Sequence, residues 1–251
     1  MHIVVLAKVV PDYLVPSMDF ELQNSRAHER YSRMLGLYDE NAIETAIQLK
    51  EKTSATLSLI SFGPEGDVQF LRKAAAMGVD QLILVKGQSD DAAVIATNLM
   101  AAVKTLGPVD LILAGQQSAD MDRGVVPGIL AQMLETPFIP QVGYIDPKDG
   151  GWAVTQITAT GKRDLEFKGP GVLSITSIPE NVPRIPVVRA IFAAKKKPVT
   201  KLESVDQGKM PLTELGVEIP KTKSVCEFID VEDMNAAAKI LLTRLTEERY
   251  I

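Results

Sequence analysis

The sequence has little of what several classes of protein require. It contains a single cysteine, Cys226, which excludes an internal disulfide and favours a reducing compartment. Its two histidines, His2 and His28, have no partners at metal-ligand spacing. A net charge of -5 gives no electrostatic reason to expect nucleic acid as a partner. No apolar stretch approaches the roughly 20 residues of a membrane span, so direct membrane insertion is not expected.

Common catalytic and phosphate-binding motifs are also missing. The sequence has neither a GxGxxG fingerprint nor a GxxxxGK[ST] loop, and it suggests no Ser/His/Asp set. Cys226 has no histidine near it in the sequence, which argues against a nucleophile. The first residues, MHIVVLAKVVPD, lack a basic leader and a small-residue cleavage site, so we interpret them as a buried strand and expect a cytoplasmic location. These absences favour a cofactor carrier over a hydrolase.

Short apolar runs alternate with longer amphipathic segments over the first two thirds of the chain. Apolar residues make up 46% and charged residues 24%, as in ordinary globular proteins. Four repeats of strand then helix predict an α/β fold with a doubly wound, mostly parallel sheet. The expected strands cover residues 3–6, 56–61, 81–85 and 109–114, and the expected helices cover 40–52, 67–77, 91–106 and 125–134.

The pattern changes after Pro137. Residues 152–158 and 172–176 are predicted strands that extend the sheet in antiparallel fashion, and three prolines predict an irregular loop over 177–189. Residues 199–222 are too poor in apolar side chains to build a core, so we expect an extended arm, followed by an amphipathic terminal helix over 231–249. The predicted parts are a nucleotide-binding α/β core domain (1–190) and a C-terminal arm with its helix (191–251).

Ligands of such sheets bind in loops at the carboxyl ends of the strands. Three loops qualify, at residues 6–13, 61–64 and 113–124. In the third, Asp120 or Asp122 is expected to cap the next helix, and free N–H groups from residue 123 to 126 suit a phosphate, with Arg123 adding charge. A polar surface loop with an ordinary helix cap explains the same pattern. The groups that suit a ligand there are Gly115, Gln116, Gln117 and Ser118.

Several segments stand in the order and spacing of a known family. They are VVLAK (4–8), YDENAIE (38–44), FGP (62–64), AMGVD (76–80), residues 110–122, PR (183–184) and AKKKP (194–198). In these segments the chain resembles the electron transfer flavoprotein beta family, which includes the FixA-type proteins. The resemblance covers nearly the whole chain, and its strength lies in the combination, because each segment alone is weak.

The resemblance implies an adenine nucleotide alpha-hydrolase-like core in a heterodimer with a larger alpha subunit, on which the arm and terminal helix pack. In the family, the alpha subunit holds most of an FAD, which the beta subunit covers from the other side. The beta subunit keeps a nucleotide of its own, a structural AMP in most members. Tyr13 matches an aromatic position that approaches the flavin in some members. The implied nucleotide contacts are Leu6, Ala7, Gly36, Asp39, Phe62, Gly63, Gly115, Gln116, Gln117, Ser118, Asp120, Asp122, Arg123, Gly124, Val125 and Val126.

The resemblance also implies a docking loop for flavin-dependent dehydrogenases and an electron carrier without catalysis of its own. A membrane quinone oxidoreductase or another acceptor would receive the electrons. The family's leucine anchor falls near Pro179 or Glu180, so Ile178 or Val182 is expected to replace it. The implied docking residues are Ile178, Pro179, Glu180, Val182 and Arg184.

The chain departs from the family at several positions. Gly36-Leu37 stands where many members have Asn-Pro, and Arg123 and Val125 stand where Thr and Gln are common. An acidic Gly-Gly segment is reduced to Thr160-Gly161. Two alternatives stay open. One is the beta subunit of a bifurcating flavoprotein with a second FAD in place of AMP, and the other is a stand-alone nucleotide-binding α/β protein.

Overall fold

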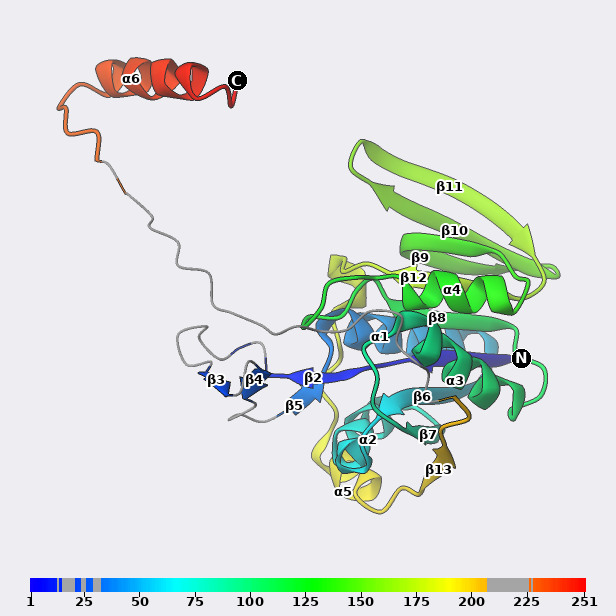
Figure 1. Cartoon of the computed structure of the whole chain (residues 1–251). Helices are drawn as coiled ribbons and strands as arrows, with labels where there is room; N and C mark the ends of the chain where they lie inside the picture. Colours follow the sequence, from blue (N-terminus) through cyan, green and yellow to red (C-terminus); the bar gives the residue numbers. More distant parts are fainter. Residues whose placement is uncertain (13, 15–20, 24–25, 29–32, 207–225, 227) are drawn as a thin grey trace. The chain divides into compact units, whose positions relative to one another are not determined.

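Among the described residues, nine strands form one sheet in the order β11-β10-β9-β12-β8-β1-β6-β7-β13 (Figure 1). The computed structural model describes residues 1–12, 14, 21–23, 26–28, 33–206, 226 and 228–251. The chain divides into two units, Met1–Glu21 with Ala27–Leu215, and Leu22–Arg26 with Gly216–Ile251, and each is described by itself. The strands of the sheet are β1 (His2–Leu6), β6 (Thr56–Gly63), β7 (Gln81–Lys86), β8 (Leu111–Gly115), β9 (Phe138–Lys148), β10 (Gly151–Thr158), β11 (Gly161–Lys168), β12 (Gly171–Ile175) and β13 (Val199–Glu203).

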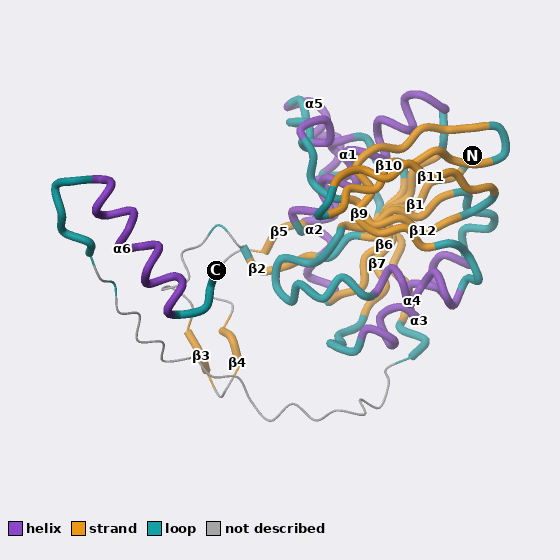
Figure 2. The backbone as a smooth tube through the Cα atoms, turned by 90° about the horizontal axis from the view of Figure 1, so that it is seen from above, coloured by secondary structure: helices purple, strands orange, loops and turns teal. Residues whose placement is uncertain are grey.

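Helices cover both faces of the sheet, as Figure 2 shows from above. The helices α1 (Leu37–Thr53) and α2 (Val68–Met77) pack on one face, and α3 (Ala92–Lys104) and α4 (Val126–Met133) pack on the other. Successive side chains of β1 serve opposite faces, because Ile3 and Val5 belong to the first cluster while Val4 and Leu6 belong to the second. Strands buried on both faces read as continuous apolar runs. The predicted doubly wound, mostly parallel fold is confirmed.

The region after Pro137 is more regular than the sequence indicated. β10 runs antiparallel to β9 and β11, as expected, but β12 lies parallel between β8 and β9, so its expected antiparallel direction was wrong. All five residues of β12 are buried, which fits a central parallel strand. Within the expected irregular loop lies η3 (Pro179–Asn181), and α5 (Val188–Ala194) begins at its end.

The sheet continues beyond the expected end of the core at residue 190. β13 pairs in parallel with β7, from Val199 opposite Leu82 to Glu203 opposite Lys86. Ion pairs of Lys86 with Glu203 and of Lys201 with Glu65 accompany this edge. The start of the expected arm is therefore an edge strand, and residues 207–225 lie outside the described residues.

The terminal helix predicted from the sequence is present as α6 (Met234–Glu247). The Asp233 side chain accepts a hydrogen bond from the Asn235 N–H and caps its start. None of its described residues is buried, and Met234, Leu241 and Leu242 are exposed. The remaining short elements are β2 (Val9–Pro11), β3 (Glu21–Gln23), β4 (Arg26–His28), β5 (Arg33–Leu35) and η2 (Glu65–Asp67).

Candidate functional site

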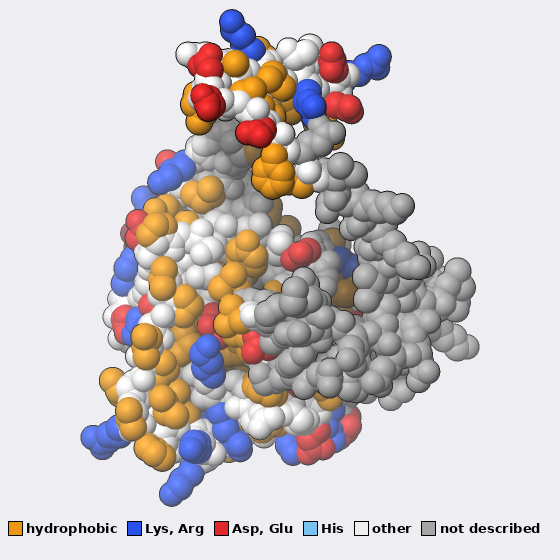
Figure 3. All heavy atoms as spheres, turned by 90° about the vertical axis from the view of Figure 1, so that its left-hand side faces the viewer, with side chains coloured by type: hydrophobic (Ala, Val, Ile, Leu, Met, Phe, Trp, Pro, Cys, Tyr) orange, Lys and Arg blue, Asp and Glu red, His pale blue; other side chains and the backbone are white. Residues whose placement is uncertain are grey.

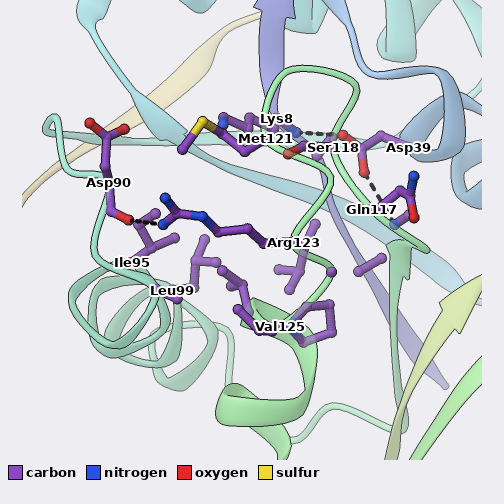
Figure 4. A pocket seen from close by; sticks show the side chains of 18 of the residues that line it. Lys8, Asp39, Asp90, Ile95, Leu99, Gln117, Ser118, Met121, Arg123 and Val125 are labelled. Atoms are coloured by element: carbon purple, nitrogen blue, oxygen red, sulfur yellow. Dashed lines mark hydrogen bonds between the residues drawn. The ribbon is translucent and has the colours of Figure 1, made fainter. Parts of the chain in front are cut away.

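A pocket opens at the carboxyl ends of β1 and β8 (Figure 4). The chain leaves β1 toward β6 and β7 on one side and returns to β8 on the other, so the strand order reverses between β1 and β8. Such a switch point is where open α/β sheets bind ligands. The pocket is lined by Leu6, Ala7, Lys8, Asp39, Ile60, Ser89, Asp90, Ala92, Ile95, Leu99, Ala114, Gly115, Gln117, Ser118, Met121, Arg123, Gly124, Val125, Val126 and Pro127.

The inner part of the pocket is apolar. The strand ends supply Leu6, Ile60 and Ala114, and one side of α3 supplies Ile95 and Leu99. Most of these side chains belong to or pack against the core cluster under α3 and α4, so the floor is fixed by the fold. A flat apolar group such as a purine ring would be removed from water there.

Charged side chains cross the mouth of the pocket. The Lys8 ammonium lies 2.6 Å from the Asp120 carboxylate, and the Arg123 guanidinium donates to the Asp90 carbonyl at 3.1 Å. Figure 4 shows Arg123 extending from the loop before α4 to the loop after β7. Burial favours a raised pKa for Asp120, but the hydrogen bond and charge of Lys8 outweigh it and lower the pKa of Asp120. Both cations are thus held where an anionic group would meet them.

Asp39, in the first turn of α1, joins the two strand ends that frame the pocket. Its carboxylate accepts the Lys8 N–H at 2.9 Å and the Gly115 N–H at 3.1 Å. Burial raises the pKa of Asp39 to about 7, and these two hydrogen bonds and the Lys8 charge oppose that shift. Asp39 therefore ties the end of β1 to the end of β8 across the switch point.

Two glycines permit this close packing. A Cβ on Gly115 would lie 2.8 Å from backbone atoms of Tyr38 and Asp39, so no larger residue fits without movement of α1. Gly124 has φ +61°, and a Cβ there would lie 2.7 Å from the Gln116 carbonyl oxygen. The expectation that Gly115 permits a close approach is correct, but the group that approaches is the start of α1.

The expected cap of α4 by Asp120 or Asp122 was wrong. The N-cap position is Val125, and none of the described side chains caps the helix. Asp120 is engaged by Lys8, and Asp122 accepts a hydrogen bond from the Gln117 amide at 2.9 Å. The first turn of α4, with Pro127 in it, consequently presents backbone N–H groups that no side chain satisfies, beside the pocket mouth.

The structure brings together most of the implied nucleotide contacts. Gly36 supports the site, since its N–H donates to the Lys8 carbonyl and a Cβ there would meet the Asp39 carboxylate at 2.6 Å. Phe62 and Gly63, at the end of β6, lie beside Gly87 and Asp67 and do not line the pocket. Tyr13 lies outside the described residues. The implied contacts that line the pocket are Leu6, Ala7, Asp39, Gly115, Gln117, Ser118, Arg123, Gly124, Val125 and Val126, while Gln116, Asp120 and Asp122 stand behind it.

Sequence reasoning missed one wall of the pocket. The loop after β7 contributes Ser89 and Asp90, and α3 contributes Ile95 and Leu99. Lys8 was noted in its loop but not assigned to the site. The rule that selected the other three loops, ligand binding at carboxyl ends of parallel strands, would have selected the loop after β7 as well.

The implied docking loop is held against α1. Arg184 donates to Glu44 from Nε and Nη2, both at 2.9 Å, and also pairs with Glu51. The Gln48 amide donates to the Glu180 carbonyl at 2.8 Å. The pKa of Glu44, which burial favours raising, is lowered by Arg184, and the hydrogen bonds to Glu44 and Glu51 raise the pKa of Arg184. Ile178 is half-buried and Pro179 and Glu180 are exposed, as is Val182.

Two further searches gave negative results for the described residues. No group of three or more His, Cys, Asp or Glu side chains could hold a metal ion in the part of the chain that the structure describes. Within the same residues, no helix is long and apolar enough to cross a membrane.

A doubly wound sheet with a pocket at its switch point defines an α/β protein of the nucleotide- or cofactor-binding class. The electron transfer flavoprotein domain matches residues 28–207. Relatives include the electron transfer flavoprotein subunit beta of Mycobacterium leprae, 31% identical over 96% of this chain and 87% of the relative, and that of Clostridium acetobutylicum, 31% identical over all of both chains. The caffeyl-CoA reductase-Etf complex subunit CarD of Acetobacterium woodii is 30% identical over all of both chains. The chain belongs to the electron transfer flavoprotein family, with the beta subunits as its relatives.

Proposed function

We propose that this chain is the beta subunit of a heterodimeric electron transfer flavoprotein that carries electrons from flavin-dependent dehydrogenases to a downstream acceptor. The names of its relatives support a partner subunit and an electron carrier. The flavin would supply the redox chemistry, and this chain would bind and orient. The proposal includes an FAD held mainly by the alpha subunit, and a cytoplasmic location on the evidence of the lone cysteine.

The observation that carries the proposal is the chemistry of the pocket. Its floor is apolar, while its mouth combines the uncapped start of α4 with the cations Lys8 and Arg123. An apolar slot next to free N–H donors and positive charge fits an adenine ring followed by a phosphate. The residues present therefore fit AMP, with Ile95 and Leu99 toward the base and Arg123 and the start of α4 toward the phosphate.

The second unit supports a partner subunit. The helix α6 exposes Met234, Leu241 and Leu242, and Phe228 and Tyr250 on either side of it are also exposed. Amphipathic helices usually gain their stability from burial of the apolar face. We propose that residues 207–251 lie on the alpha subunit, which would cover this face.

The test is the nucleotide content of the assembled complex. The chain is co-expressed with an alpha-type subunit, the complex is purified, and released nucleotides are identified by chromatography and absorbance. One FAD and one AMP per heterodimer are expected. Two FAD would replace the simple carrier by the bifurcating alternative, and a chain that stays alone without flavin would refute the proposal.

A pair of variants locates the AMP. Arg123→Glu places a negative charge at the mouth of the pocket and is expected to lower AMP content while FAD content is retained. Arg163→Glu, the same change at an exposed position of the edge strand β11, is the matched control and should leave both contents unchanged. Equal AMP content in the two variants would contradict the assigned pocket.

A further inference from the structure

The segment from the end of the docking loop into α5 exposes large apolar side chains. Ile185 is 93% exposed, and Val187, Val188 and Phe192 are each more than 60% exposed. Monomeric proteins rarely expose contiguous apolar surface unless it serves an interaction. We call Val182, Ile185, Val187, Val188, Ile191 and Phe192 the α5 patch.

The α5 patch is not needed by the protein's own core. Ala194 is buried and Ala190, one turn earlier, is half-buried, on the side where α5 packs against α2. The larger residues Val188, Ile191 and Phe192 follow i, i+3, i+4 spacing on the outer side. A short helix with small residues inside and large apolar residues outside has its main contact surface directed away from the core.

The backbone that carries the α5 patch is rigid. Pro183 and Pro186 fix φ on either side of the most exposed residue, Ile185. Arg184 anchors the same stretch to α1 through Glu44 and Glu51. Because little conformational freedom would be lost on binding, such a surface is suited to form contacts at low entropic cost.

The surroundings of the α5 patch are positively charged, although the whole chain carries a net charge of -5. No Asp or Glu occurs between Glu180 and Glu203, and none occurs in α2, on which α5 packs. Arg189, Lys195 and Lys196 are exposed beside the apolar residues, with the Lys195 ammonium 5.1 Å from the centre of the Phe192 ring. Figure 3 shows hydrophobic and basic side chains together at the lower end of this face, where Figure 1 places α5.

We propose that the α5 patch docks the electron-donating dehydrogenase, through an apolar groove on that protein whose rim carries carboxylates. The apolar side chains would enter the groove, with Ile185 as the anchor, and Arg189 with Lys195–Lys197 would face the acidic rim. This inference rests on the proposed carrier function and moves the anchor out of residues 178–184, where Ile178 is half-buried in its own chain. A second copy of this chain is a poor occupant, because two basic surroundings would repel each other.

The test measures flavin reduction in the heterodimer by purified flavin-dependent dehydrogenases of the same organism, each reduced with its own substrate. Ile185→Glu is expected to raise the KM for the heterodimer about tenfold or more, because a charged side chain cannot enter an apolar groove. Reduction of the same flavin by dithionite should be unchanged. Val205→Glu is the matched control, since Val205 is 67% exposed outside the patch. Replacing Lys195, Lys196 and Lys197 by Gln should raise the KM at low salt and flatten its dependence on salt.

Each other occupant gives a different result. Equal KM values for Ile185→Glu and Val205→Glu, or wild-type heterodimer that accepts electrons from none of the dehydrogenases, would overturn the docking proposal. Loss of heterodimer in Ile185→Glu alone would assign the patch to the alpha subunit, and a wild-type self-association that Ile185→Glu abolishes would assign it to a second copy. Flavin content is measured before any dehydrogenase is added, so a wild-type complex without FAD refutes the proposed function separately.

Discussion

Replacing Asp39 by Asn tests the electrostatics of the clamp at the switch point. The Asp39 side chain is buried, and its two oxygens accept the backbone N–H groups of Lys8 and Gly115. Asn has nearly the same shape but cannot ionise, so it keeps one acceptor and removes the charge that burial disfavours. The variant therefore isolates the contribution of ionisation to stability.

The sign and size of the effect follow from the pKa of Asp39, which burial raises from 3.8 to about 7. Between these two values the folded protein holds a proton that the unfolded chain has released, so the free energy of unfolding falls as pH rises. Across the whole interval the loss amounts to ~4 kcal/mol, from about 1.4 kcal/mol for each unit of pKa. Asp39→Asn lacks this loss, and its stability relative to wild type should increase by up to that amount between pH 4 and pH 8.

The assay is urea unfolding of the full chain at several pH values, followed by the fluorescence of Trp152, which is buried. Asp149→Asn, at an exposed turn position, controls for general effects of removing a carboxylate. A wild-type minus Asp39→Asn difference that stays constant from pH 4 to pH 8 would refute the reasoning, because it would show that Asp39 ionises as readily in the folded chain as in the unfolded one.

Three further substitutions test other parts of the structure. Gly115→Ala should lower the free energy of unfolding by about 1–3 kcal/mol because its Cβ meets the backbone of α1, whereas Gly66→Ala, with open space around it, should change stability little; urea titration compares them. Arg184→Gln should raise the pKa of Glu44, which NMR titration measures, and should weaken the stabilisation that is present above the unfolded pKa of Glu44 and lost as pH falls; an unchanged pKa would contradict the ion pair. Asn98→Ala removes the hydrogen bonds that hold residues 204–206 to α3, so the amides of Val205 and Asp206 should exchange faster while those of the sheet centre do not.

The alternation of strand and helix was readable because local chemistry and tertiary packing agree there. The apolar runs of β1, β6, β7 and β8 are buried on both faces, and Gly78 ends α2 with a positive φ of 134°. Elements at the margin of the sheet carry a weaker signal. In β11 the pattern is GKRDLEFK, and in β13 it is VTKLE, because edge strands need charged residues to limit pairing with other chains.

The site could be predicted only where one loop supplies several of its groups. Residues 115–126 met that condition, and most of them line the pocket. The clamp by Asp39 could not be foreseen, because it depends on two N–H groups that lie 31 positions before it and 76 positions after it. The cap of α4 was misassigned for a similar reason, since long-range partners such as Lys8 engage the carboxylate that local reasoning gave to the helix.

The polar residues of α1 impose a strict constraint on its length. Asp39 holds the pocket, and Asn41, Glu44 and Gln48 hold residues 180–184 at intervals of three and four, so both regions are measured from one rod. Insertion of one residue after Asp39 would rotate every later side chain by about 100° and shift it by about 1.5 Å. The stripe would then face away from the docking loop while the pocket kept its clamp. Length variation among related chains should accordingly fall outside α1, and a one-residue insertion within it should uncouple the two regions.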